Sequence, residues 1–576
     1  MPSFAVQQSL FRAYDIRGSH KLFTSDFIDA LGNAFAYLYT VSAVHSKNTG
    51  SKKAIVVIGY DVRGGSDSIA QRLGDILTQH GVQVVQLGLV TTPMMAFWAE
   101  RYHGHGIVAT ASHSAKDILG IKWLVDHKSP NSIEIQRLYQ QLINSKPQTH
   151  LNDQKDSFYQ NSPYQNTSLS MIDTSLDYQT DLPHEQVATA YIAAITQVFE
   201  QLYPSDKKNS ENNFRSSDKL DLVVVIDCMN GATSTIAQRL FNRFCQQVIM
   251  LNDIPDGSFP AGNPDPAEPY RLEQLQQNVV DYQADIGMAF DGDGDRLVIV
   301  DNSGKVVTPD HLLYLLAKIA LAERPDSLST SQILFDIKCS HHLPKLLSEL
   351  GTKPVLSKTG SSLMRRQMQQ DDSPILFAGE LSGHFIFNDG RFIIYDDAMY
   401  AALRLLHWLS AINDLGGSAL TDITQLLPAM VNTADHYLPM PKTSEEDCSV
   451  VEQLTRLCHY LRKLVAAAIE RDSGYYLLNT CPPSLCRCST DRQHITLERA
   501  KYLLPVGTKL SCIDGVRLDF AHGFGVLRQS NTSHNLTVRF AGDTLDDLKD
   551  IQAKFAALCR PFDQKLAEQI AAIPAE

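Results

Sequence analysis

Asp291, Asp293 and Asp295 stand at alternate positions, separated by single glycines and followed at once by Arg296. An ionised aspartate offers only oxygen acceptors, which are the ligands that hard cations such as Mg²⁺ and Ca²⁺ prefer. Glycine lets the backbone turn tightly enough for alternate side chains to converge. The pattern therefore predicts a loop that binds a divalent metal beside a guanidinium suited to phosphate.

Two other interpretations of this aspartate loop, residues 291–296, are open. An EF-hand also begins with alternating aspartates, but it requires Gly at its sixth position and Glu at its twelfth. This chain has Arg296 and Asn302 there. The flanking runs 284–290 and 297–301 are short and apolar, which is typical of strands and not of the helices of an EF-hand. A solvated acidic hairpin tip is the remaining alternative.

Ser112 lies in the run Thr110-Ala-Ser-His113, directly after a strand-like run that ends at Ala109. Strand-to-loop turns commonly present nucleophiles. No Gly-x-Ser-x-Gly elbow surrounds this serine, so an esterase-type triad is poorly supported. Lys122 lies ten residues further on, and its cation could neutralise the charge of a phosphorylated serine. Taken alone, these residues describe either a nucleophile or a polar turn.

Two more polar runs could bind a sugar phosphate. The run Gly379-Glu-Leu-Ser-Gly-His384 brings together an acid, a hydroxyl and an imidazole, which suit sugar hydroxyls. The run Arg528-Gln-Ser-Asn-Thr-Ser533 places a guanidinium beside short hydroxyl and amide groups, which suit a phosphate. Short polar residues also simply make turns, so neither run decides the function by itself.

Size and charge limit the class of protein. At 576 residues the chain is too long for one core and predicts about three to five domains. Asp and Glu outnumber Lys and Arg by 64 to 51, which argues against nucleic-acid or anionic-membrane partners. The sequence has no basic signal region and no run of about 18 apolar residues. Its ten scattered cysteines suit reduced thiols, so we expect a cytoplasmic location.

Apolar strand-like runs alternate with turns and helix-period segments, which predicts α/β architecture over most of the chain. In a first region, the run 54–59 leads to a helix and then to strand-like runs at 82–85 and 106–109. The apolar face of that helix should hold Ile69, Leu73, Ile76 and Leu77. A second region begins at 222–226 and closes on the aspartate loop.

Two further regions also contain predicted strands and helices. A third has a helix at 312–321 and strand-like runs at 333–335, 375–377 and 385–387. The last, from about residue 431, mixes a helix at 451–469 with late strands and an amphipathic segment at 545–570. Two polar segments, 145–181 and 204–219, bury too little apolar area to order strongly, and we expect surface loops or linkers there.

Taken together and in this order, the motifs resemble those of the α-D-phosphohexomutases, of the bacterial phosphomannomutase/phosphoglucomutase type. The five main runs are Phe11-Arg-Ala-Tyr-Asp-Ile-Arg-Gly18, Thr110-Ala-Ser-His113, the aspartate loop, Gly379-Glu-Leu-Ser-Gly-His384 and Arg528-Gln-Ser-Asn-Thr532. Further agreeing runs are Gly88-Leu-Val-Thr-Thr-Pro93, Asp227-Cys-Met-Asn-Gly-Ala232, Pro255-Asp-Gly-Ser-Phe-Pro260, Asn263-Pro-Asp-Pro266, Phe335-Asp-Ile-Lys338 and Asp514-Gly-Val-Arg517. The resemblance covers nearly the whole chain outside the two polar segments.

The resemblance implies three related α/β mixed-sheet domains and a C-terminal α+β domain around a central cleft. The expected domains are 1–189 with the phosphoserine loop, 190–310 with the metal loop, 311–430 with the sugar-binding loop and 431–576 with the phosphate-binding loop. It also implies reversible phosphoryl transfer between the 1- and 6-positions of a hexose phosphate, through a hexose 1,6-bisphosphate and with Mg²⁺. The partners would be small hexose phosphates, and the protein a monomer or weak homo-oligomer.

The resemblance also assigns roles residue by residue. Ser112 matches the phosphoserine carrier, whose phosphate completes the metal site of Asp291, Asp293 and Asp295. His384, with Lys122 or Arg17, is the candidate for proton transfer. Substrate contacts are expected from Tyr14, Arg17, Arg296, Lys338, Thr359, Gly360, Glu380, Ser382, His384, Arg528, Ser530, Asn531 and Thr532.

Three departures from the family pattern bear on turnover and sugar preference. Ser114 and Ala115 replace the usual Asn-Pro, so the turn after Ser112 lacks a proline restraint. Ser361 stands where a histidine is common, and Arg365 where Lys is common. The nucleophile, the metal ligands and the phosphate-binding run all remain, so the reaction class is less affected.

The sequence predicts the sugar of the substrate less narrowly than it predicts the reaction. Leu381 resembles the phosphomannomutase or dual phosphomannomutase/phosphoglucomutase type, because phosphoglucosamine mutases usually have Gln there. We therefore expect mannose or glucose phosphates, with a phosphoglucosamine mutase as the alternative. A metal-dependent sugar phosphatase and a non-catalytic sugar-phosphate-binding protein are further alternatives.

Overall fold

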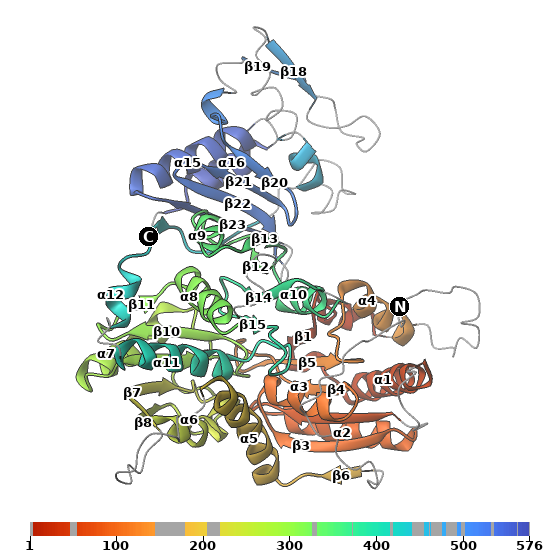
Figure 1. Ribbon diagram of the computed structural model, residues 1–576. Coiled ribbons are helices and arrows are strands. Elements are labelled where there is room, and N and C mark those ends of the chain that lie inside the picture. The colour runs from red at the N-terminus through yellow and green to blue at the C-terminus, as the bar shows by residue number, and fades with distance from the viewer. Residues whose placement is uncertain are drawn as a thin grey trace. The chain divides into compact units, whose positions relative to one another are not determined.

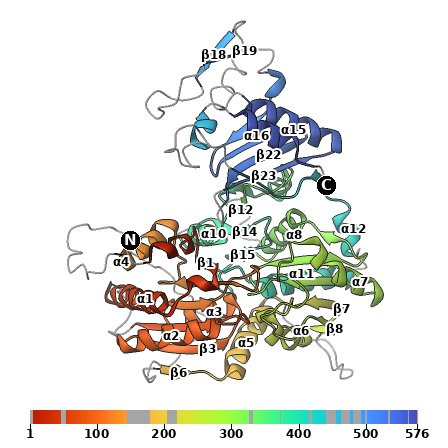
Figure 2. The ribbon, with the colours of Figure 1, turned by 180° about the vertical axis from the view of Figure 1, so that it is seen from behind.

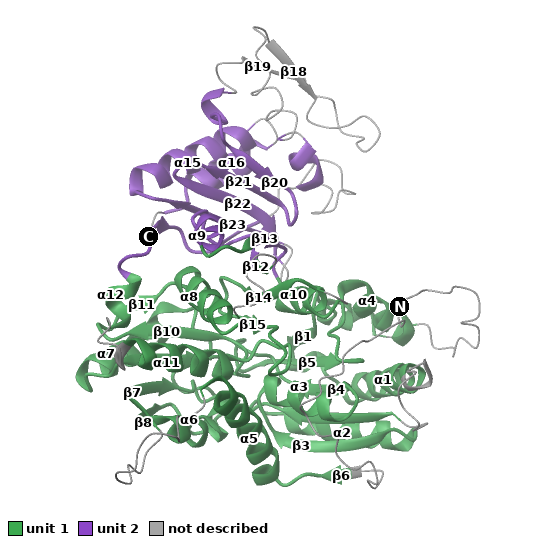
Figure 3. Ribbon diagram, in the orientation of Figure 1, with its two compact units in different colours: residues 1–334, 350–353, 360–424 green, residues 335–349, 354–359, 425–576 purple. Residues whose placement is uncertain are grey.

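The computed structural model describes residues 4–45, 54–143, 179–203, 219–324, 331–370, 373–414, 419–439, 454–459, 461, 475–479, 492–496, 501–530, 535–560 and 563–574. The chain forms two compact units (Figure 3). Unit 1 comprises residues 1–334, 350–353 and 360–424, and unit 2 comprises residues 335–349, 354–359 and 425–576.

The first sheet of unit 1 has six strands in the order β1-β5-β4-β2-β3-β6 (Figure 1). The strands are β1 (Ile16–Ser19), β2 (Ile55–Tyr60), β3 (Gln83–Leu89), β4 (Gly106–Ala109), β5 (Ile118–Leu124) and β6 (Gln179–Asp181). Parallel pairing joins β2 to β3 and β4, and β3 to β6, whereas β5 is antiparallel to β4 and β1. The expected mixed sheet is therefore present.

The helices of this region are η1 (Ala5–Leu10), η2 (His20–Leu22), α1 (Ser25–His45), α2 (Ser66–Gln79), α3 (Thr92–Arg101) and α4 (Ser132–Ile143). The apolar face predicted for α2 is confirmed, because Ile69, Leu73, Ile76 and Leu77 are all buried. Figure 2 shows α2 beside α1 from behind. The Thr91 side chain caps α3 by accepting a hydrogen bond from the Met94 amide.

The second sheet has the order β11-β10-β9-β7-β8. Its strands are β7 (Leu220–Asp227), β8 (Cys245–Leu251), β9 (Ile286–Phe290), β10 (Leu297–Asp301) and β11 (Val306–Val307), with helices α5 (His184–Leu202), η4 (Ala232–Thr235), α6 (Ala237–Phe244), η5 (Pro269–Arg271) and α7 (Glu273–Asp281). β9 and β10 pair antiparallel, and every residue of both strands is buried. The flanks of the aspartate loop are therefore strands, as predicted, which rules out an EF-hand.

The third sheet is ordered β13-β12-β14-β15, and the chain passes between the units within β12. Its strands are β12 (Gln332–Asp336), β13 (Lys353–Ser357), β14 (Ile375–Gly379) and β15 (Phe385–Phe387). The helices of this part of the chain are α8 (Pro309–Ala322), α9 (Leu343–Glu349), α10 (Ser361–Met368), α11 (Ala398–Asp414) and α12 (Leu420–Thr424). Because β14 and β15 form an antiparallel pair, residues 380–384 are the connection between them.

Unit 2 contains an antiparallel sheet ordered β16-β23-β22-β21-β20, with β17 also paired to β23. Its elements are β16 (Val431–Asn432), β17 (His436–Pro439), β20 (Lys509–Ser511), β21 (Val516–Phe520), β22 (Gly523–Gln529), β23 (Asn535–Gly542), α15 (Leu545–Cys559) and α16 (Gln564–Ala571). A separate hairpin pairs β18 (Tyr475–Asn479) with β19 (Arg492–Thr496). This all-antiparallel sheet with helices matches the expected α+β character.

The polar segments were predicted to be loops, and one of these predictions is wrong at its end. Residues Gln179–Asp181 form β6, which pairs with β3 and extends the first sheet. Backbone pairing orders this short polar run although it buries little apolar area. Residues 144–178 and 204–218, and part of the helix expected at 451–469, lie outside the described residues. Among the described helices, none is long and apolar enough to cross a membrane.

Candidate active site

The aspartate loop is the buried connection between β9 and β10. Asp291 and Asp293 are fully buried and Asp295 is 3% exposed. One ligand oxygen from each lies within 4.8 Å of the others. Gly292 allows this packing, because a Cβ there would lie 2.5 Å from the Ser112 carbonyl oxygen. A solvated acidic hairpin tip is therefore excluded.

The carboxylates of the aspartate loop are buried close enough together to repel one another. Asp291 Oδ1 accepts hydrogen bonds from the amides of Gly294, Asp295 and Arg296. Burial, and then repulsion by Asp295 and Asp293, raise the pKa of Asp291 well above its ordinary value. Within the described residues, Asp293 Oδ1 makes no hydrogen bond. This oxygen-only donor set fits a hard divalent cation.

Ser112 is held against the aspartate loop in a backbone conformation that is unusual for serine. It follows β4 with φ of 53°, in the left-handed region that disfavours side chains. Its hydroxyl donates to Asp291 Oδ2 at 2.6 Å and lies 3.2 Å from His113 Nδ1. Burial, and then repulsion by Arg296, lower the pKa of His113 well below its ordinary value, so this imidazole is neutral. Strain of this kind clusters at functional sites.

Arg63 fixes the turn that carries Ser112. Its buried guanidinium pairs with Asp61, with Nε 3.1 Å from Oδ2. It also donates to the carbonyl oxygens of the turn, those of Ser112 at 2.5 Å, Ser114 at 2.6 Å and Ala115 at 2.6 Å, and more weakly to that of Ile118 at 3.4 Å. Arg63 thus restrains the turn in which Ser114 and Ala115 replace the usual Asn-Pro. Sequence reasoning missed Arg63, although its position just after the buried run 54–59 was a signal.

Lys122 supplies the counter-charge of the aspartate loop. From β5 its ammonium lies 2.7 Å from Asp293 Oδ2 and 2.6 Å from Asp295 Oδ2. Burial alone would lower the pKa of Lys122, but the two carboxylates outweigh it and raise the pKa above its ordinary value. Thr92, which the sequence did not single out, donates its hydroxyl to Asp293 Oδ2 at 2.5 Å. Strand β5 and helix α3 of the first sequence region thus both contact the Asp293 carboxylate of the second region.

The loop between β14 and β15 brings His384 to the same place. Nε2 of His384 lies 3.3 Å from Asp295 Oδ1, and Nδ1 lies 3.2 Å from Glu380 Oε2 and 2.9 Å from Ser382 Oγ. Burial would lower the pKa of His384, but attraction to Asp295 and the bond to Glu380 outweigh it and raise the pKa to about 10. The backbone amide of Leu297 donates to the Gly383 carbonyl and joins this loop to β10.

The remaining predicted residues of unit 1 surround this core. Arg17 on β1 pairs with Asp15, with Nε 2.9 Å from Oδ2, and donates Nη1 to Ser114 Oγ at 3.2 Å. The departure at Ser114 therefore contacts a predicted catalytic residue. Tyr14 packs against Gly360, where a Cβ would lie 2.6 Å from the ring. The Gly360 amide donates to Glu380 Oε1 at 2.5 Å.

The guanidinium of Arg296 lies next to the aspartate loop. Its Nη1 is 3.7 Å from Asp265 Oδ1 and its Nε is 4.0 Å from Asp291 Oδ2. Burial would lower the pKa of Arg296, but attraction to Asp265 and Asp291 raises it. Asp265 belongs to the run Asn263-Pro-Asp-Pro266, which the sequence analysis noted without assigning a role to this carboxylate. The phosphate-seeking cation predicted from the sequence is thus present and charged.

The other two departures contact each other. Arg365 donates Nη1 to Ser361 Oγ at 3.2 Å and forms a short ion pair with Asp396. Its guanidinium also lies over the Tyr395 ring, 4.0 Å from the centroid. A histidine at 361 would occupy the space next to this guanidinium, so the serine and the arginine fit as a pair. Neither Asp396 nor Tyr395 was expected from the sequence.

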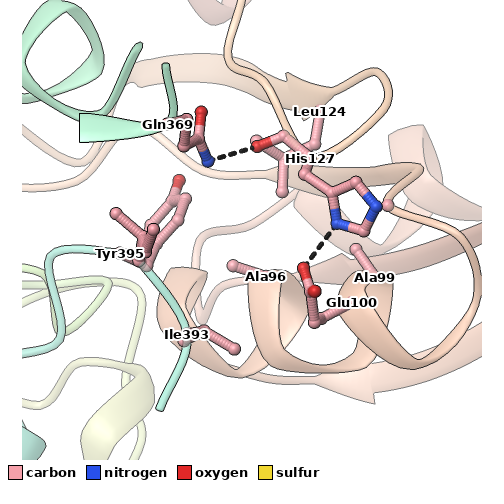
Figure 4. A pocket seen from close by; sticks show the side chains of 10 residues that line it. Ala96, Ala99, Glu100, Leu124, His127, Gln369, Ile393 and Tyr395 are labelled. Atoms are coloured by element: carbon pink, nitrogen blue, oxygen red, sulfur yellow. Dashed lines mark hydrogen bonds and ion pairs between the residues drawn. The ribbon is translucent and has the colours of Figure 1, made fainter. Parts of the chain in front are cut away.

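A pocket in unit 1 is lined by Tyr395 and by residues of the first and third sequence regions (Figure 4). His127 Nδ1 lies 2.5 Å from Glu100 Oε2 at its edge, and Gln369 donates to the His127 carbonyl at 2.9 Å. Tyr395 lines the pocket, whereas the predicted site residues do not. The pocket therefore joins the first and third sequence regions without belonging to the candidate site.

Predicted residues in unit 2 form their own cluster of charged groups. Asp514 Oδ2 accepts from Arg528 Nε at 2.9 Å and from Thr359 Oγ1 at 2.8 Å. Lys338 Nζ donates to Asp435 Oδ2 at 2.7 Å, and the amide of Ser530 donates to the Asn535 carbonyl at 2.8 Å. Arg528 Nη2 makes no hydrogen bond to any part of the chain that is described. Asn531 and Thr532 lie outside the described residues.

Known proteins resemble this chain along its length. Residues 8–148, 191–304 and 308–428 match the family described as phosphoglucomutase/phosphomannomutase, in its alpha/beta/alpha domains I, II and III respectively. The phosphomannomutase/phosphoglucomutase of Pseudomonas syringae is 31% identical over 96% of this chain and 95% of its own length. The phosphoglucomutase of Neisseria gonorrhoeae is 27% identical over 96% and 97%. A crystal structure of a phosphoglucomutase/phosphomannomutase family protein from Burkholderia thailandensis, 26% identical, covers 100% of both chains with a TM-score of 0.70.

Proposed function

The chain belongs to the phosphoglucomutase/phosphomannomutase family, and we propose that it transfers a phosphoryl group between the 1- and 6-positions of a hexose through Ser112. The family makes it a hexose-phosphate mutase. The observation that carries the role of Ser112 is its hydroxyl, 2.6 Å from Asp291 Oδ2 at the edge of the three buried carboxylates. A serine in that place can share a cation with the aspartates once it carries a phosphate.

Phosphorylated Ser112 would give its phosphoryl group to the free hydroxyl of a hexose monophosphate. The bond from phosphorus to Ser112 Oγ breaks, a bond to the sugar oxygen forms, and the product is a hexose 1,6-bisphosphate. The sugar hydroxyl loses one proton and Ser112 Oγ gains one, so no net proton is consumed. In the return step the other phosphate passes to Ser112, which leaves the isomeric monophosphate.

The ligand set fits Mg²⁺, which Asp291, Asp293 and Asp295 would hold. When bound, this cation would neutralise charge on the transferred phosphoryl group. Lys122, whose ammonium already lies between Asp293 and Asp295, would add a second positive charge there. His384 is protonated at neutral pH because of its raised pKa, so we assign it proton donation to the oxygen that loses the phosphoryl group. Arg17 would help orient the phosphate.

The sugar and the second phosphate would be bound by separate sets of residues. We assign the sugar hydroxyls to Glu380 and Ser382, whose oxygens lie beside His384. The non-reacting phosphate is assigned to Lys338, Arg528, Ser530, Asn531 and Thr532. The free Nη2 of Arg528 supports this assignment within the described part of unit 2. Tyr14, Arg296, Thr359 and Gly360 would complete the contacts to substrate.

Mannose and glucose phosphates are the proposed substrates. Relatives named phosphomannomutase/phosphoglucomutase and phosphoglucomutase support this choice, as does Leu381 in the sugar loop. Glucosamine phosphate is the alternative. The decisive experiment supplies mannose 1-phosphate, glucose 1-phosphate and glucosamine 1-phosphate separately, with Mg²⁺ and a trace of hexose 1,6-bisphosphate.

We expect 6-phosphates from mannose and glucose, and almost none from the Ser112→Ala variant. Ser68→Ala, which removes an exposed hydroxyl from α2, is the matched control and should behave as wild type. Equal turnover by Ser112→Ala would refute the assigned nucleophile. Inorganic phosphate released in step with substrate loss would show a sugar phosphatase instead.

We also propose that the enzyme acts in the cytoplasm, as a monomer or weak homo-oligomer. Cys228, Cys245, Cys339, Cys458, Cys512 and Cys559, the cysteines within the described residues, are all free thiols, which suits a reducing compartment. Sedimentation velocity at micromolar concentration tests the assembly state, and a stable tetramer would contradict it.

A further inference from the structure

Unit 2 contains a second cluster of metal-ligating side chains, formed by His341, His342, His522 and Asp543 and called here the histidine cluster. His342 Nε2 lies 2.7 Å from Asp543 Oδ1, and His341 Nε2 lies 3.0 Å from the same oxygen. His522 Nδ1 lies 3.1 Å from the other oxygen, Oδ2. One ligand atom each from His341, His342 and Asp543 lies within 4.8 Å of the others.

Three separate segments of unit 2 bring these residues together. His341 and His342 directly precede α9, His522 forms the turn between β21 and β22, and Asp543 follows β23. The Asp543 amide donates to the His522 carbonyl at 2.9 Å, which fixes the carboxylate beside that turn. The bond from His342 to Asp543 then links positions that are 201 residues apart in the sequence. The cluster is therefore formed by the fold and not by one local motif.

The His341 ring shows that the cluster is not a completed hydrogen-bond network. Its side chain is 7% exposed, and neither of its ring nitrogens makes a hydrogen bond within the described residues. Buried polar atoms normally have a partner, because leaving one unpaired is costly. Its Nε2 is close enough to Asp543 Oδ1 for a bond but poorly directed for one. A cation between the two rings and the carboxylate would satisfy all three.

A guanidinium near the His341 ring is already engaged by other groups. The nearby Arg517 guanidinium is engaged by Asp519, at 2.7 Å, and by the carbonyl oxygens of Ile337 and Cys339, so its charge is partly compensated.

We propose that His341, His342 and Asp543 bind a transition-metal ion of the Zn²⁺ type, with His522 positioning the carboxylate. Two imidazole nitrogens and one carboxylate oxygen are ligands that Zn²⁺ accepts and that Mg²⁺ does not favour. Ligand atoms about 2.0–2.1 Å from a tetrahedral Zn²⁺ lie about 3.3 Å apart. The observed separations of 2.7 and 3.0 Å need only a small opening to reach that value. A bound ion would fasten the segment before α9 to β23.

The test titrates metal-free, full-length protein with Co²⁺ in the presence of saturating Mg²⁺, which covers the aspartate loop. Co²⁺ substitutes for Zn²⁺ and reports imidazole ligation through its visible absorption. We expect one equivalent to bind, and Zn²⁺ to displace it. His342→Gln and Asp543→Asn should each weaken binding by at least about tenfold, whereas His184→Gln, at an exposed position on α5, should not.

Two further measurements distinguish binding at the histidine cluster from binding elsewhere on the protein. Asp293→Asn, which damages the aspartate loop, should leave Co²⁺ binding unchanged. Zn²⁺ should raise the Tm of the wild type but not that of His342→Gln, whatever the starting Tm of the variant, because only a protein that binds the ion gains stability from it. Co²⁺ binding with wild-type affinity in both His342→Gln and Asp543→Asn, or loss of Co²⁺ binding in Asp293→Asn, would overturn the proposal.

Discussion

The aspartate loop of unit 1 and the histidine cluster of unit 2 both gather ligating atoms where strands end, but they differ in burial and in internal charge. The three aspartates are at most 3% exposed, and two of them, Asp293 and Asp295, already bind a protein cation, Lys122. In the histidine cluster, the Asp543 and His522 side chains are 28% and 69% exposed, and the one charged ligand is Asp543. The first is a dry site of oxygen atoms, and the second a half-open site rich in imidazole.

This difference shows how one chain can direct two kinds of cation to two places. Oxygen ligands without imidazole favour a hard ion such as Mg²⁺, whereas imidazole favours a softer ion such as Zn²⁺. Burial makes every charge in the aspartate loop costly, so each carboxylate there needs several partners. The histidine cluster is partly exposed to water, so its polar groups need fewer protein partners. Mutations in unit 1 should therefore cost more than mutations in the histidine cluster.

The largest effect should come from Ser112→Ala. Loss of the phosphoryl acceptor should reduce kcat/KM for glucose 1-phosphate by about a thousandfold or more, as is usual when a nucleophile is removed. Co²⁺ binding to the histidine cluster should stay unchanged in the same preparation. Activity is measured by 6-phosphate formation, and a variant that loses Co²⁺ binding as well would show that the two sites are not independent.

Arg63→Ala should have the next largest effect, on stability. The substitution removes the cation that pairs with Asp61 and leaves the Asp61 carboxylate as an unpaired buried charge. The side chains of Arg63 and Asp61 are 0% and 1% exposed, respectively. The free energy of unfolding should fall by about 3–5 kcal/mol, measured by urea denaturation. Arg72→Ala is the control, because its pair with Asp29 at 2.6 Å is exposed and should matter little. Equal losses in both variants would contradict the role of burial.

Thr92→Val should weaken Mg²⁺ activation by about tenfold. The change removes the hydroxyl that donates to Asp293 Oδ2, but keeps the side-chain shape and the amide bond from Thr92 to the Asp293 carbonyl. The measurement is the Mg²⁺ concentration for half-maximal activity. Thr78→Val, whose hydroxyl donates only within α2, is the control. A fall in kcat at saturating Mg²⁺ without this shift would point to a different role for Thr92.

His522→Gln should have the smallest effect, a loss of only a few-fold to about tenfold in Zn²⁺ affinity. His522 lies on the exposed side and contacts the carboxylate oxygen that faces away from His341 and His342. Competition between Zn²⁺ and a chromophoric chelator measures the affinity. If His522→Gln lost as much affinity as His342→Gln, His522 would be a direct ligand. The histidine cluster would then not differ from the aspartate loop in needing fewer partners.

Local sequence patterns predicted those parts of the fold and site that depend on neighbouring residues. Apolar runs predicted the strands on both sides of the aspartate loop. The helical spacing of apolar residues predicted the buried face of α2. The position of Ser112 at a strand end follows from the run that precedes it. The role of Ser112 came from the resemblance to a family, because the residues around it, taken alone, favoured a polar turn over a nucleophile.

Contacts between distant segments could not be predicted in this way. Arg63 reaches the turn after Ser112 because β2 and β4 are neighbours in the sheet, and sequence periodicity does not give strand order. The left-handed backbone of Ser112 depends on that same tertiary contact. The contact between Ser361 and Arg365 links two departures that looked independent in the sequence. His341 and Asp543 meet only because their segments fold together within unit 2.

Lys122 gives the aspartate loop a property that a structural metal site lacks. In a zinc finger the ion itself holds the fold, and removing it unfolds the chain. Here the ammonium bridges Asp293 and Asp295 from within the protein, so the loop carries its own counter-ion. A divalent cation bound there would therefore be able to exchange with the surrounding solution while the fold persists. Turnover would then follow the free concentration of the cation, and a chelated sample would recover fully once the cation returned.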